Sequence, residues 1–166
     1  TLIGVCVSSG SQEVVLGTAN GMAIRFAETE IRSMGRAATG VRGIKLEEGD
    51  VVVGVGVVSP DSTLLSVCEN GFGKRTAIDE YRLQGRGGMG VINIRTNERN
   101  GKVVALLQVV DGDEIMLMTQ EGMVVRTPVD ELRSIGRATQ GVKLIAISEN
   151  DRVVSVARVE REEGEG

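Results

Sequence analysis

The sequence predicts an all-β fold made of three copies of one strand-rich unit, and three observations lead to this prediction. Gly accounts for 23 of the 166 residues, about twice the usual share of ~7%, and Val is also abundant, whereas aromatic residues are rare. A pattern of residues recurs every 50 or 51 positions. Each recurrence starts with a turn motif between two apolar runs. Val-rich runs separated by Gly-rich turns favour strands over helices.

The repeat aligns without gaps over three windows, residues 21–44, 71–94 and 122–145. Nine of the 24 aligned columns are identical in all three windows. In the first window the identical residues are Gly21, Arg25, Glu30, Arg32, Gly35, Arg36, Gly40, Val41 and Ile44. A fixed period of this length indicates a repeat architecture, in which each unit packs on its neighbours.

Each window predicts a β-hairpin. Asn20-Gly21 and Asn70-Gly71 are strong two-residue turn motifs, because the primed turns of hairpins need positive φ angles at both central residues. Glu121-Gly122 is a weaker motif at the matching place. The predicted hairpin arms are residues 13–18 with 22–27, 63–68 with 72–78, and 114–119 with 123–127.

Two further strands follow each hairpin. A Gly-rich loop leads to a third strand at 41–46, 91–95 and 142–147, and a turn then leads to a fourth strand at 51–58, 103–110 and 152–159. Four strands in ~50 residues are typical of a propeller blade. Residues 2–8 are predicted to form one more fourth strand. Since propellers usually close with ~4 to 8 blades, we expect the missing blades upstream in a longer parent chain, or a partner that covers the exposed edge.

Charge and composition exclude several classes of protein. The net charge is −4, but residues 160–166 contribute −3 and are predicted to form an acidic, disordered tail after a repeat region at 1–159. The chain lacks His, and Cys6 and Cys68 are far apart, so we expect buried thiols rather than a zinc site or disulfide scaffold. No apolar run is long enough to span a bilayer, and no signal peptide is evident, which predicts a cytoplasmic chain.

The Gly-rich loops carry a resemblance to a known family. They read Met34-Gly-Arg-Ala-Ala-Thr-Gly40, Gln84-Gly-Arg-Gly-Gly-Met-Gly90 and Ile135-Gly-Arg-Ala-Thr-Gln-Gly141. The second loop resembles the Gln-Arg-Arg-Gly-Gly-Lys-Gly box in the C-terminal domain of the DNA gyrase A subunit. It matches that box at Gln84, Arg86, Gly87, Gly88 and Gly90, and it departs at Gly85 and Met89, where the family has Arg and Lys. The chain therefore resembles the later blades of that domain, with a degenerate gyrase box.

This resemblance implies a β-pinwheel, a propeller variant in which neighbouring blades exchange strands. It also implies that the domain binds and bends double-stranded DNA around a basic rim, so that the gyrase holoenzyme can introduce negative supercoils with ATP. The implied partners are duplex DNA, the remaining blades and cleavage core of the same polypeptide, and the B subunit in an A2B2 holoenzyme, with no membrane. We expect no catalytic activity and no cofactor in this chain, because ATP and Mg would act elsewhere in the holoenzyme.

The candidate DNA-binding residues are the repeated cations. Stacked blades would place equivalent Arg side chains at regular intervals along an arc, where they could hold phosphates without reading bases. For Arg25 and its equivalents a structural role is equally supported, with Glu30, Glu80 and Glu131 as ion-pair partners. The candidates are Arg36, Arg86, Arg137, Arg32, Arg82, Arg133, Arg75 and Arg126 with the neighbouring Lys74 and Lys143.

Alternatives stay open at this point. The related domain in the A-type polypeptide of topoisomerase IV is one, and a protein-interaction propeller with structural arginines is another. Residues 85–90 also fit the Gly-x-Gly-x-x-Gly dinucleotide pattern, but a strand is predicted after them where that motif requires a helix. Tyr81 aligns with Ile31 and Leu132, which predicts a packing role. The acidic tail could compete with DNA, so truncation after Arg158 is expected to tighten DNA binding.

Overall fold

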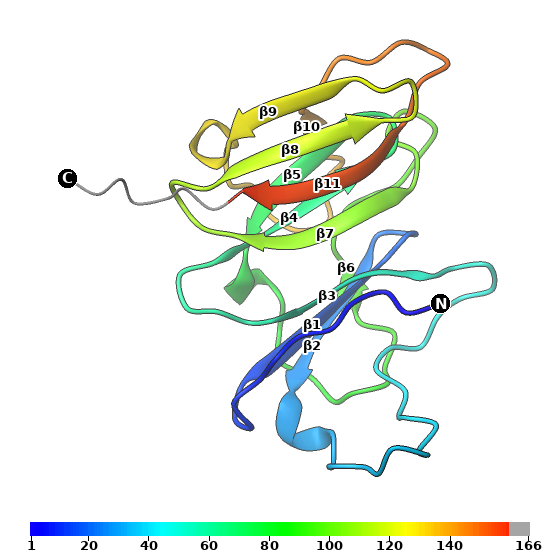
Figure 1. Ribbon diagram of the computed structural model, residues 1–166, viewed down its shortest axis with the longest axis vertical. Helices are drawn as coiled ribbons and strands as arrows, with labels where there is room; N and C mark the ends of the chain where they lie inside the picture. Colours follow the sequence, from blue (N-terminus) through cyan, green and yellow to red (C-terminus); the bar gives the residue numbers. More distant parts are fainter. Residues whose placement is uncertain (160–166) are drawn as a thin grey trace.

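The computed structural model describes residues 1–159, which contain eleven strands and three short 3₁₀ turns joined by loops. The acidic tail predicted at 160–166 lies outside these residues. The strands pair into three antiparallel sheets, and each repeat supplies the centre of one sheet (Figure 1). We call the three hairpin units blades 1, 2 and 3.

The strand bounds follow the repeat closely. Blade 1 contains β1 (Glu13–Thr18), β2 (Met22–Ala27), the turn η1 (Glu28–Glu30) and β3 (Val52–Val57). Blade 2 contains β4 (Thr63–Cys68), β5 (Phe72–Ala77), η2 (Ile78–Glu80) and β7 (Val103–Val109). Blade 3 contains β8 (Glu114–Thr119), β9 (Val124–Pro128), η3 (Val129–Glu131) and β11 (Val153–Val159). The predicted hairpins and fourth strands are thus present. The predicted two-residue primed turns are wrong, because Gly21 and Gly71 have positive φ angles but Asn20 and Asn70 do not.

Two short strands cross between blades. The sheet orders are β3-β1-β2-β6, β10-β5-β4-β7 and β11-β8-β9. Strand β6 (Val91–Ile92) comes from the second repeat but pairs with β2 of blade 1, and β10 (Val142–Lys143) comes from the third repeat but pairs with β5 of blade 2. Neighbouring blades therefore exchange strands, and the all-β pinwheel prediction is confirmed.

The predicted third strands are mostly too long, and one is wrong. Only two residues of 91–95 and of 142–147 are strand, and residues 41–46 form none. The exchange explains this difference, because each third segment pairs with the hairpin of the blade before it, and within the described residues no hairpin precedes blade 1. Residues 2–8 are likewise not a strand, although the Cys6 Sγ lies 3.7 Å from the carbonyl oxygen of Val55.

The turn glycines position the exchanged segments as well as the hairpins. Gly21 has φ +87°, and the amides of Asn93 and Ile94 donate to its carbonyl oxygen. A Cβ on Gly21 would lie only 2.2 Å from the carbonyl oxygen of Ile94. Gly71 shows the same arrangement with Leu144 and Ile145 of the next repeat. Glycine is required here both for the left-handed backbone and for the close approach of the neighbouring blade.

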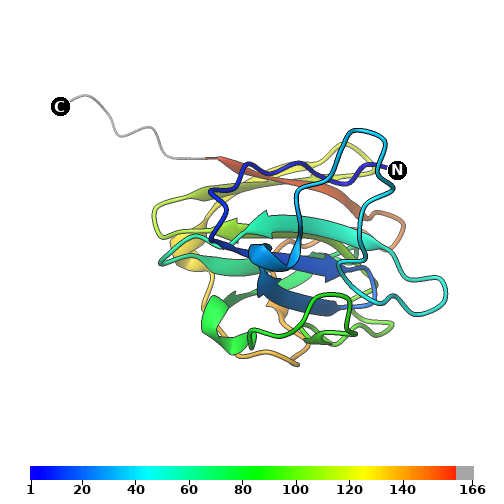
Figure 2. The same cartoon turned by 90° about the horizontal axis from the view of Figure 1, so that it is seen from below.

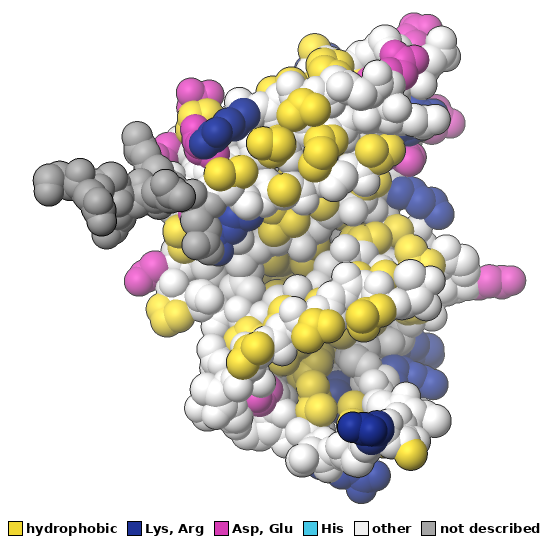
Figure 3. All heavy atoms as spheres, viewed as in Figure 1, with side chains coloured by type: hydrophobic (Ala, Val, Ile, Leu, Met, Phe, Trp, Pro, Cys, Tyr) yellow, Lys and Arg dark blue, Asp and Glu magenta, His cyan; other side chains and the backbone are white. Residues whose placement is uncertain are grey.

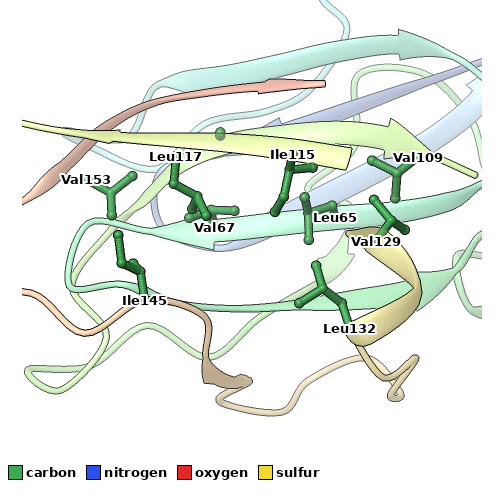
Figure 4. Close-up of a cluster of buried hydrophobic side chains, with 10 residues drawn as sticks. Leu65, Val67, Val109, Ile115, Leu117, Val129, Leu132, Ile145 and Val153 are labelled. Atoms are coloured by element: carbon green, nitrogen blue, oxygen red, sulfur yellow. The ribbon is translucent and has the colours of Figure 1, made fainter. Parts of the chain in front are cut away.

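The hydrophobic core lies between the blades. Figure 4 shows the largest cluster, in which Leu65, Val67 and Val109 of blade 2 face Ile115 and Leu117 of blade 3. A second cluster joins blades 1 and 2 and includes Val15, Leu64, Leu106 and the fully buried Tyr81. The prediction that Tyr81 packs in the interior is therefore confirmed. Cys68 is buried as expected, whereas Cys6 is exposed, because the segment before β1 lies on the surface.

The fourth strands form the inner side of the stack of blades. Strand β3 contacts β7, and β7 contacts β11, so these strands follow one another (Figures 1 and 2). The exchanged strands β6 and β10 lie at the opposite edges of their sheets. This order places the Gly-rich loops and the exchanged segments on the outer edge, which we call the rim. No helix in residues 1–159 is long and apolar enough to cross a membrane.

Candidate nucleic-acid interface

The rim is strongly basic, although the whole chain is acidic. It is formed by three equivalent segments, residues 32–46, 82–97 and 133–147, each running from the 3₁₀ turn through the Gly-rich loop to the exchanged segment. These segments hold ten of the 19 basic residues and none of the 23 acidic residues. In Figure 3 Lys and Arg side chains lie along the right margin and at the lower end, acidic side chains also lie at the upper right, and hydrophobic side chains form rows on the face toward the viewer. The fold thus separates charges that the net charge averages out.

The strand arginines reach forward to the next blade. In blade 1, Arg25 forms an ion pair with Glu13 (Nε to Oε2, 2.5 Å), and its Nη1 donates to the carbonyl oxygens of Ile78 and Tyr81 at 3.1 and 3.2 Å. A longer ion pair joins it to Asp79 at 3.8 Å. Its side chain is only 16% exposed. Arg25 therefore fastens blade 1 to the turn at the end of the blade 2 hairpin.

Arg75 does the same between blades 2 and 3. Its Nη1 donates to the carbonyl oxygen of Val129 at 3.1 Å, its Nε donates to the Thr63 hydroxyl at 2.8 Å, and Nη2 pairs with Asp111. All its nitrogens are thus engaged, and the side chain is 11% exposed. These contacts give Arg75 a structural role at the joint, and its contact with DNA stays a prediction.

Arg126 is the matching strand arginine of blade 3, and within residues 1–159 no further blade follows it. Arg126 pairs with Glu114 of its own hairpin, and its side chain is 55% exposed. The predicted partners of these arginines, Glu30, Glu80 and Glu131, are not their ion-pair partners. Acidic residues of the hairpins and adjoining loops take that place, since they lie beside the guanidinium group across the sheet.

The loop arginines reach backward to the preceding blade. Arg86 donates from Nε to the carbonyl oxygen of Glu30 at 3.3 Å and from Nη1 to that of Arg42 at 2.5 Å. Arg137 donates from Nε and Nη1 to the carbonyl oxygens of Glu80 and Ile92, both at 2.8 Å. In both residues Nη2 makes no hydrogen bond within residues 1–159. These two side chains are therefore half-buried fasteners with one donor group left for a ligand.

The equivalent loop arginine of blade 1 is exposed. Arg36 makes no hydrogen bond or ion pair within the described residues. Arg32, Arg82 and Arg133 are also exposed and unpaired in residues 1–159. Lys143 is exposed, and its Nζ lies 5.7 Å from the ring centroid of Phe72.

Lys74 is the clearest correction among the predicted contacts. Its side chain is buried at 1% exposure, and Nζ donates to the carbonyl oxygen of Gly136 at 2.7 Å. Burial lowers the pKa of Lys74 from 10.5 to about 8, and the positive charge of Arg137 acts in the same direction. Lys74 fastens blade 3 to blade 2 from inside, so it cannot reach DNA in this fold.

The degenerate box forms a joint with blade 1. The amide of Gln84 donates to the carbonyl oxygen of Arg25, and Gly87 donates to that of Gly43 at 2.7 Å. The carbonyl oxygen of Gly88 accepts the amide of Lys45 at 2.8 Å, and a Cβ on Gly90 would lie 2.2 Å from the carbonyl oxygen of Ala23. The box backbone is thus used for contacts between blades. Strand β6 follows it, so the helix that a dinucleotide motif needs is absent here.

Among the side chains of the box, residues 84–90, only that of Arg86 is charged. Gly85 is exposed with open space around it, and Met89 is 48% exposed. The two cations that the family box carries at these positions would therefore have pointed to the surface. Their replacement removes positive charge from this loop without disturbing the joint.

Sequence reasoning missed several rim cations because they lie outside the identical columns. Arg42 and Lys45 are exposed in the first rim segment, and Arg95 is exposed in the second. Arg99 and Arg152 are exposed beside the rim, in the turns before β7 and β11. The sequence signal that could have indicated these cations is the absence of acidic residues from three matching segments. A search limited to arginines repeated in every window does not detect it.

The fold and the rim together define a class of protein, a β-propeller with exchanged strands and a basic outer edge. A sequence model of the family described as "DNA gyrase C-terminal domain, beta-propeller" matches residues 12–59, 63–109 and 113–160, one match for each blade. The chain belongs to this DNA gyrase C-terminal domain family.

Relatives at the sequence level carry the same name. The chain is 51% identical over 158 residues to the DNA gyrase A subunit of Salmonella typhimurium, and 49% identical over 158 residues to that of Escherichia coli. Both alignments cover 95% of this chain but 18% of the relative. The chain thus spans about a fifth of the length of these relatives.

Solved structures agree on the fold. The C-terminal domain of DNA topoisomerase IV superimposes with a TM-score of 0.85 at 31% identity, covering 91% of this chain and 47% of that chain. The DNA gyrase A C-terminal domain gives a TM-score of 0.82 at 31% identity, covering 89% of this chain and 50% of that one. Structural likeness does not separate these two classes, but the family match and the sequence relatives favour gyrase A.

Proposed function

We propose that this gyrase A domain binds double-stranded DNA along its rim and bends it. The observation that carries the proposal is the separation of charge, with ten cations and no acid in the three rim segments. A surface of this kind neutralises phosphates and releases the counterions condensed on the duplex. Most of the rim cations are Arg, whose planar guanidinium group suits bidentate contacts with phosphate. Such binding does not depend on base sequence.

The curvature of the rim would bend the bound duplex. Because the blades repeat the same arrangement, equivalent cations recur at each step around the inner strands. Bending ~20 to 30 bp by 40 to 90° costs of order 1 to 6 kcal/mol. Several phosphate contacts along the arc would offset this cost.

The proposed contacts are the exposed, unpaired cations. They include Arg32, Arg36, Arg82, Arg133 and Lys143, and the free Nη2 groups of Arg86 and Arg137 add to them. Arg126 is exposed but paired with Glu114 and lies outside the three rim segments, so it is not among the proposed contacts. Lys74 and Arg75 are left out of the proposed contacts, because Lys74 is buried and Arg75 is nearly so and both bind carbonyl oxygens of the next blade.

In the whole gyrase A polypeptide, we propose that the bent DNA is presented to the cleavage core, with ATP and the B subunit driving strand passage in an A2B2 holoenzyme. ATP and Mg would act outside this chain. The groups that the rim offers are cations and backbone amides, and residues 1–159 contain no group of three His, Cys, Asp or Glu side chains that could hold a metal ion. These groups can hold and shape DNA, and they supply no nucleophile positioned by a base.

The test is duplex binding across a salt series, with single-stranded DNA as the comparison. We expect duplex preference and a slope of log affinity against log salt of about −0.9 for each phosphate contact. Removing two rim charges, Arg82→Gln with Arg133→Gln, is expected to reduce this slope by about two units. The matched control, Arg126→Gln with Arg158→Gln, removes two charges outside the rim.

A clear result would contradict the proposal. If the chain does not bind duplex even at low salt, or if the rim pair and the control pair weaken binding equally, the rim is not the DNA-binding surface. Circular dichroism of each variant would show that the fold is intact.

A further inference from the structure

We propose that Arg99 and Lys143, which lie over the ring of Phe72, form with Arg152 a phosphate-binding notch where blades 2 and 3 meet, and that this notch holds one phosphate region of a bound DNA duplex. This inference rests on the proposed function and adds a defined site to it. It involves two residues, Arg99 and Arg152, that lie outside the repeated columns. It also predicts that the two joints between blades contribute unequally to DNA binding.

The notch is a hollow of about 390 Å³ lined by these four residues together with Asn70, Ile145, Ile147, Ser148, Glu149 and Asp151. Phe72 begins β5, and Lys143 lies directly opposite it on the exchanged strand β10. The Arg99 guanidinium carbon lies 4.4 Å from the Phe72 ring centroid, and Lys143 Nζ lies 5.7 Å from it. The ring face attracts both cations and keeps them at the mouth of one hollow.

Each of the three cations has donors left for a ligand. Arg99 uses Nε for Asn100 and Nη2 for the carbonyl oxygens of Gln140 and Gly141, which leaves Nη1. Arg152 uses Nη1 for Asn70 and for its own neighbour Asp151, which leaves Nε and Nη2. Within residues 1–159, Lys143 makes no hydrogen bond or ion pair. Three positive groups thus face one hollow without a carboxylate partner in the described residues.

Two acidic residues also line the hollow, and they differ in effect. Asp151 is buried, and its Oδ1 accepts the amides of Glu121 and Arg152 at 3.0 and 2.8 Å, so its charge is compensated by the backbone. Glu149 is exposed and has no ion pair within the described residues. Its carboxylate opposes an anion at the mouth of the notch, which gives the proposal a second, opposite test.

The joint between blades 1 and 2 lacks this arrangement. The hollow there is lined by Met22 where the notch has Phe72, and by Ile92 where the notch has Lys143. The turn position that matches Arg99 is Gly49. Arg95 is its single cation, and its Nε already donates to the carbonyl oxygen of Ala138. The notch is therefore a feature of one joint and not a general consequence of the repeat.

A duplex phosphate fits this position because the notch adjoins the rim. Lys143 belongs both to the notch and to the acid-free segment 133–147, so a duplex that follows the rim passes over the hollow. The Arg and Lys donors suit phosphate oxygens, with Arg offering directional N–H groups and Lys a mobile point charge.

The experiment compares variants of the full 166-residue chain in the same salt series with a labelled duplex. Lys143→Gln with Arg152→Gln leaves the Arg99 contacts to Gln140 and Gly141 in place, so the fold should be kept. We expect this pair to weaken duplex binding several-fold and to reduce the salt slope by about two units. Glu149→Gln should tighten binding, and Phe72→Leu should weaken it while keeping an apolar side chain under the cations. Arg126→Gln with Arg158→Gln is the charge-matched control.

The outcomes separate this inference from the proposed function. If the parent chain binds no duplex, the proposed function itself fails. If the parent chain binds but the Lys143 and Arg152 pair behaves like the control pair, only the notch is overturned. Inorganic phosphate, titrated at low salt while the amide resonances of residues 143 and 152 are followed, distinguishes the source of the phosphate. Weak millimolar shifts support a site built for the polymer, whereas tight saturation by phosphate alone would overturn the assignment to duplex DNA.

Discussion

The joints between blades and the edge strand β9 of blade 3 use equivalent arginines in different ways. At the joints, Arg25 and Arg75 are buried against carbonyl oxygens of the following blade. At the edge, Arg126 occupies the same place in the repeat but is mostly exposed and paired only within its own hairpin. The comparison shows that the contacts of a repeated arginine in this fold depend first on whether a neighbouring blade packs against it. Its availability for DNA depends on whether that neighbour is present.

The loop arginines show a similar contrast, but they bind the preceding blade where the strand arginines bind the following one. Arg86 and Arg137 are tied to the preceding blade, whereas Arg36 makes no contact within the described residues. Structural and DNA-binding roles are therefore not alternatives for these side chains. A guanidinium group can fasten two blades with Nε and Nη1 and still offer Nη2 to a phosphate.

The largest expected difference between joint and edge concerns the turn glycines. Gly21→Ala forces a Cβ to within 2.2 Å of the Ile94 carbonyl oxygen at φ +87°, whereas Gly122→Ala at φ +90° meets nothing within 4 Å. We expect Gly21→Ala to lower the free energy of unfolding by about 3 kcal/mol, from backbone strain and a clash combined, and Gly122→Ala by about 1 kcal/mol from strain alone. Urea denaturation measures both, and equal losses would show that the exchanged segment does not constrain the turn.

The strand arginines give the next largest effect. Arg75→Ala removes the hydrogen bonds to the Val129 carbonyl oxygen and the Thr63 hydroxyl at the joint, together with the ion pair to the exposed Asp111, so we expect a loss of about 2 kcal/mol in stability. Arg126→Ala removes an exposed ion pair and should cost less than about 1 kcal/mol. The same denaturation experiment compares the two variants. A larger loss for Arg126→Ala would contradict the assignment of Arg75 as the fastener.

Much of this architecture could be predicted from the sequence, and the part that could not has a physical cause. The strands of the hairpins at Asn20-Gly21 and Asn70-Gly71 were placed almost to the residue, although only the Gly of each pair has the positive φ angle that the predicted turn type requires of both residues. The third segments depend on pairing with another blade, which local periodicity does not report, and they are therefore shorter than predicted. The same limit applied to the site. Nothing in the sequence around Lys74 distinguishes its buried amine from the exposed one of Lys143.

Lys74 provides a pH test of the joint between blades 2 and 3. Its pKa is about 8 in the folded chain and near 10.5 when unfolded, so between these values the unfolded chain binds more protons. Stability should therefore rise with pH in this window because of Lys74, by at most about 1.4 kcal/mol per pH unit. Burial raises the pKa of Cys68 from 9.0 to about 12, and this opposes the rise above pH 9.

The variant Lys74→Met isolates the contribution of the lysine. We expect the difference in stability between the parent chain and Lys74→Met to change between about pH 7.5 and 9 in favour of the parent, while Lys143→Met, which changes an exposed lysine, serves as the control. Denaturation at several pH values measures this difference. A difference that stays constant with pH would mean that Lys74 is solvated in the folded chain.

The smallest expected effect lies in the backbone of the Gly-rich loops. Ala138 has φ +56°, and the matching residue of blade 2 is Gly87 at φ +82°. An L-residue in the left-handed region is strained by roughly 1 to 2 kcal/mol, while glycine adopts it freely but loses more chain entropy on folding. Ala138→Gly should therefore stabilise the chain by at most about 1 kcal/mol, and Gly87→Ala should destabilise it by a similar amount. If both substitutions destabilise, the Ala138 side chain contributes packing that outweighs its backbone strain, and the two loops differ in more than their glycine content.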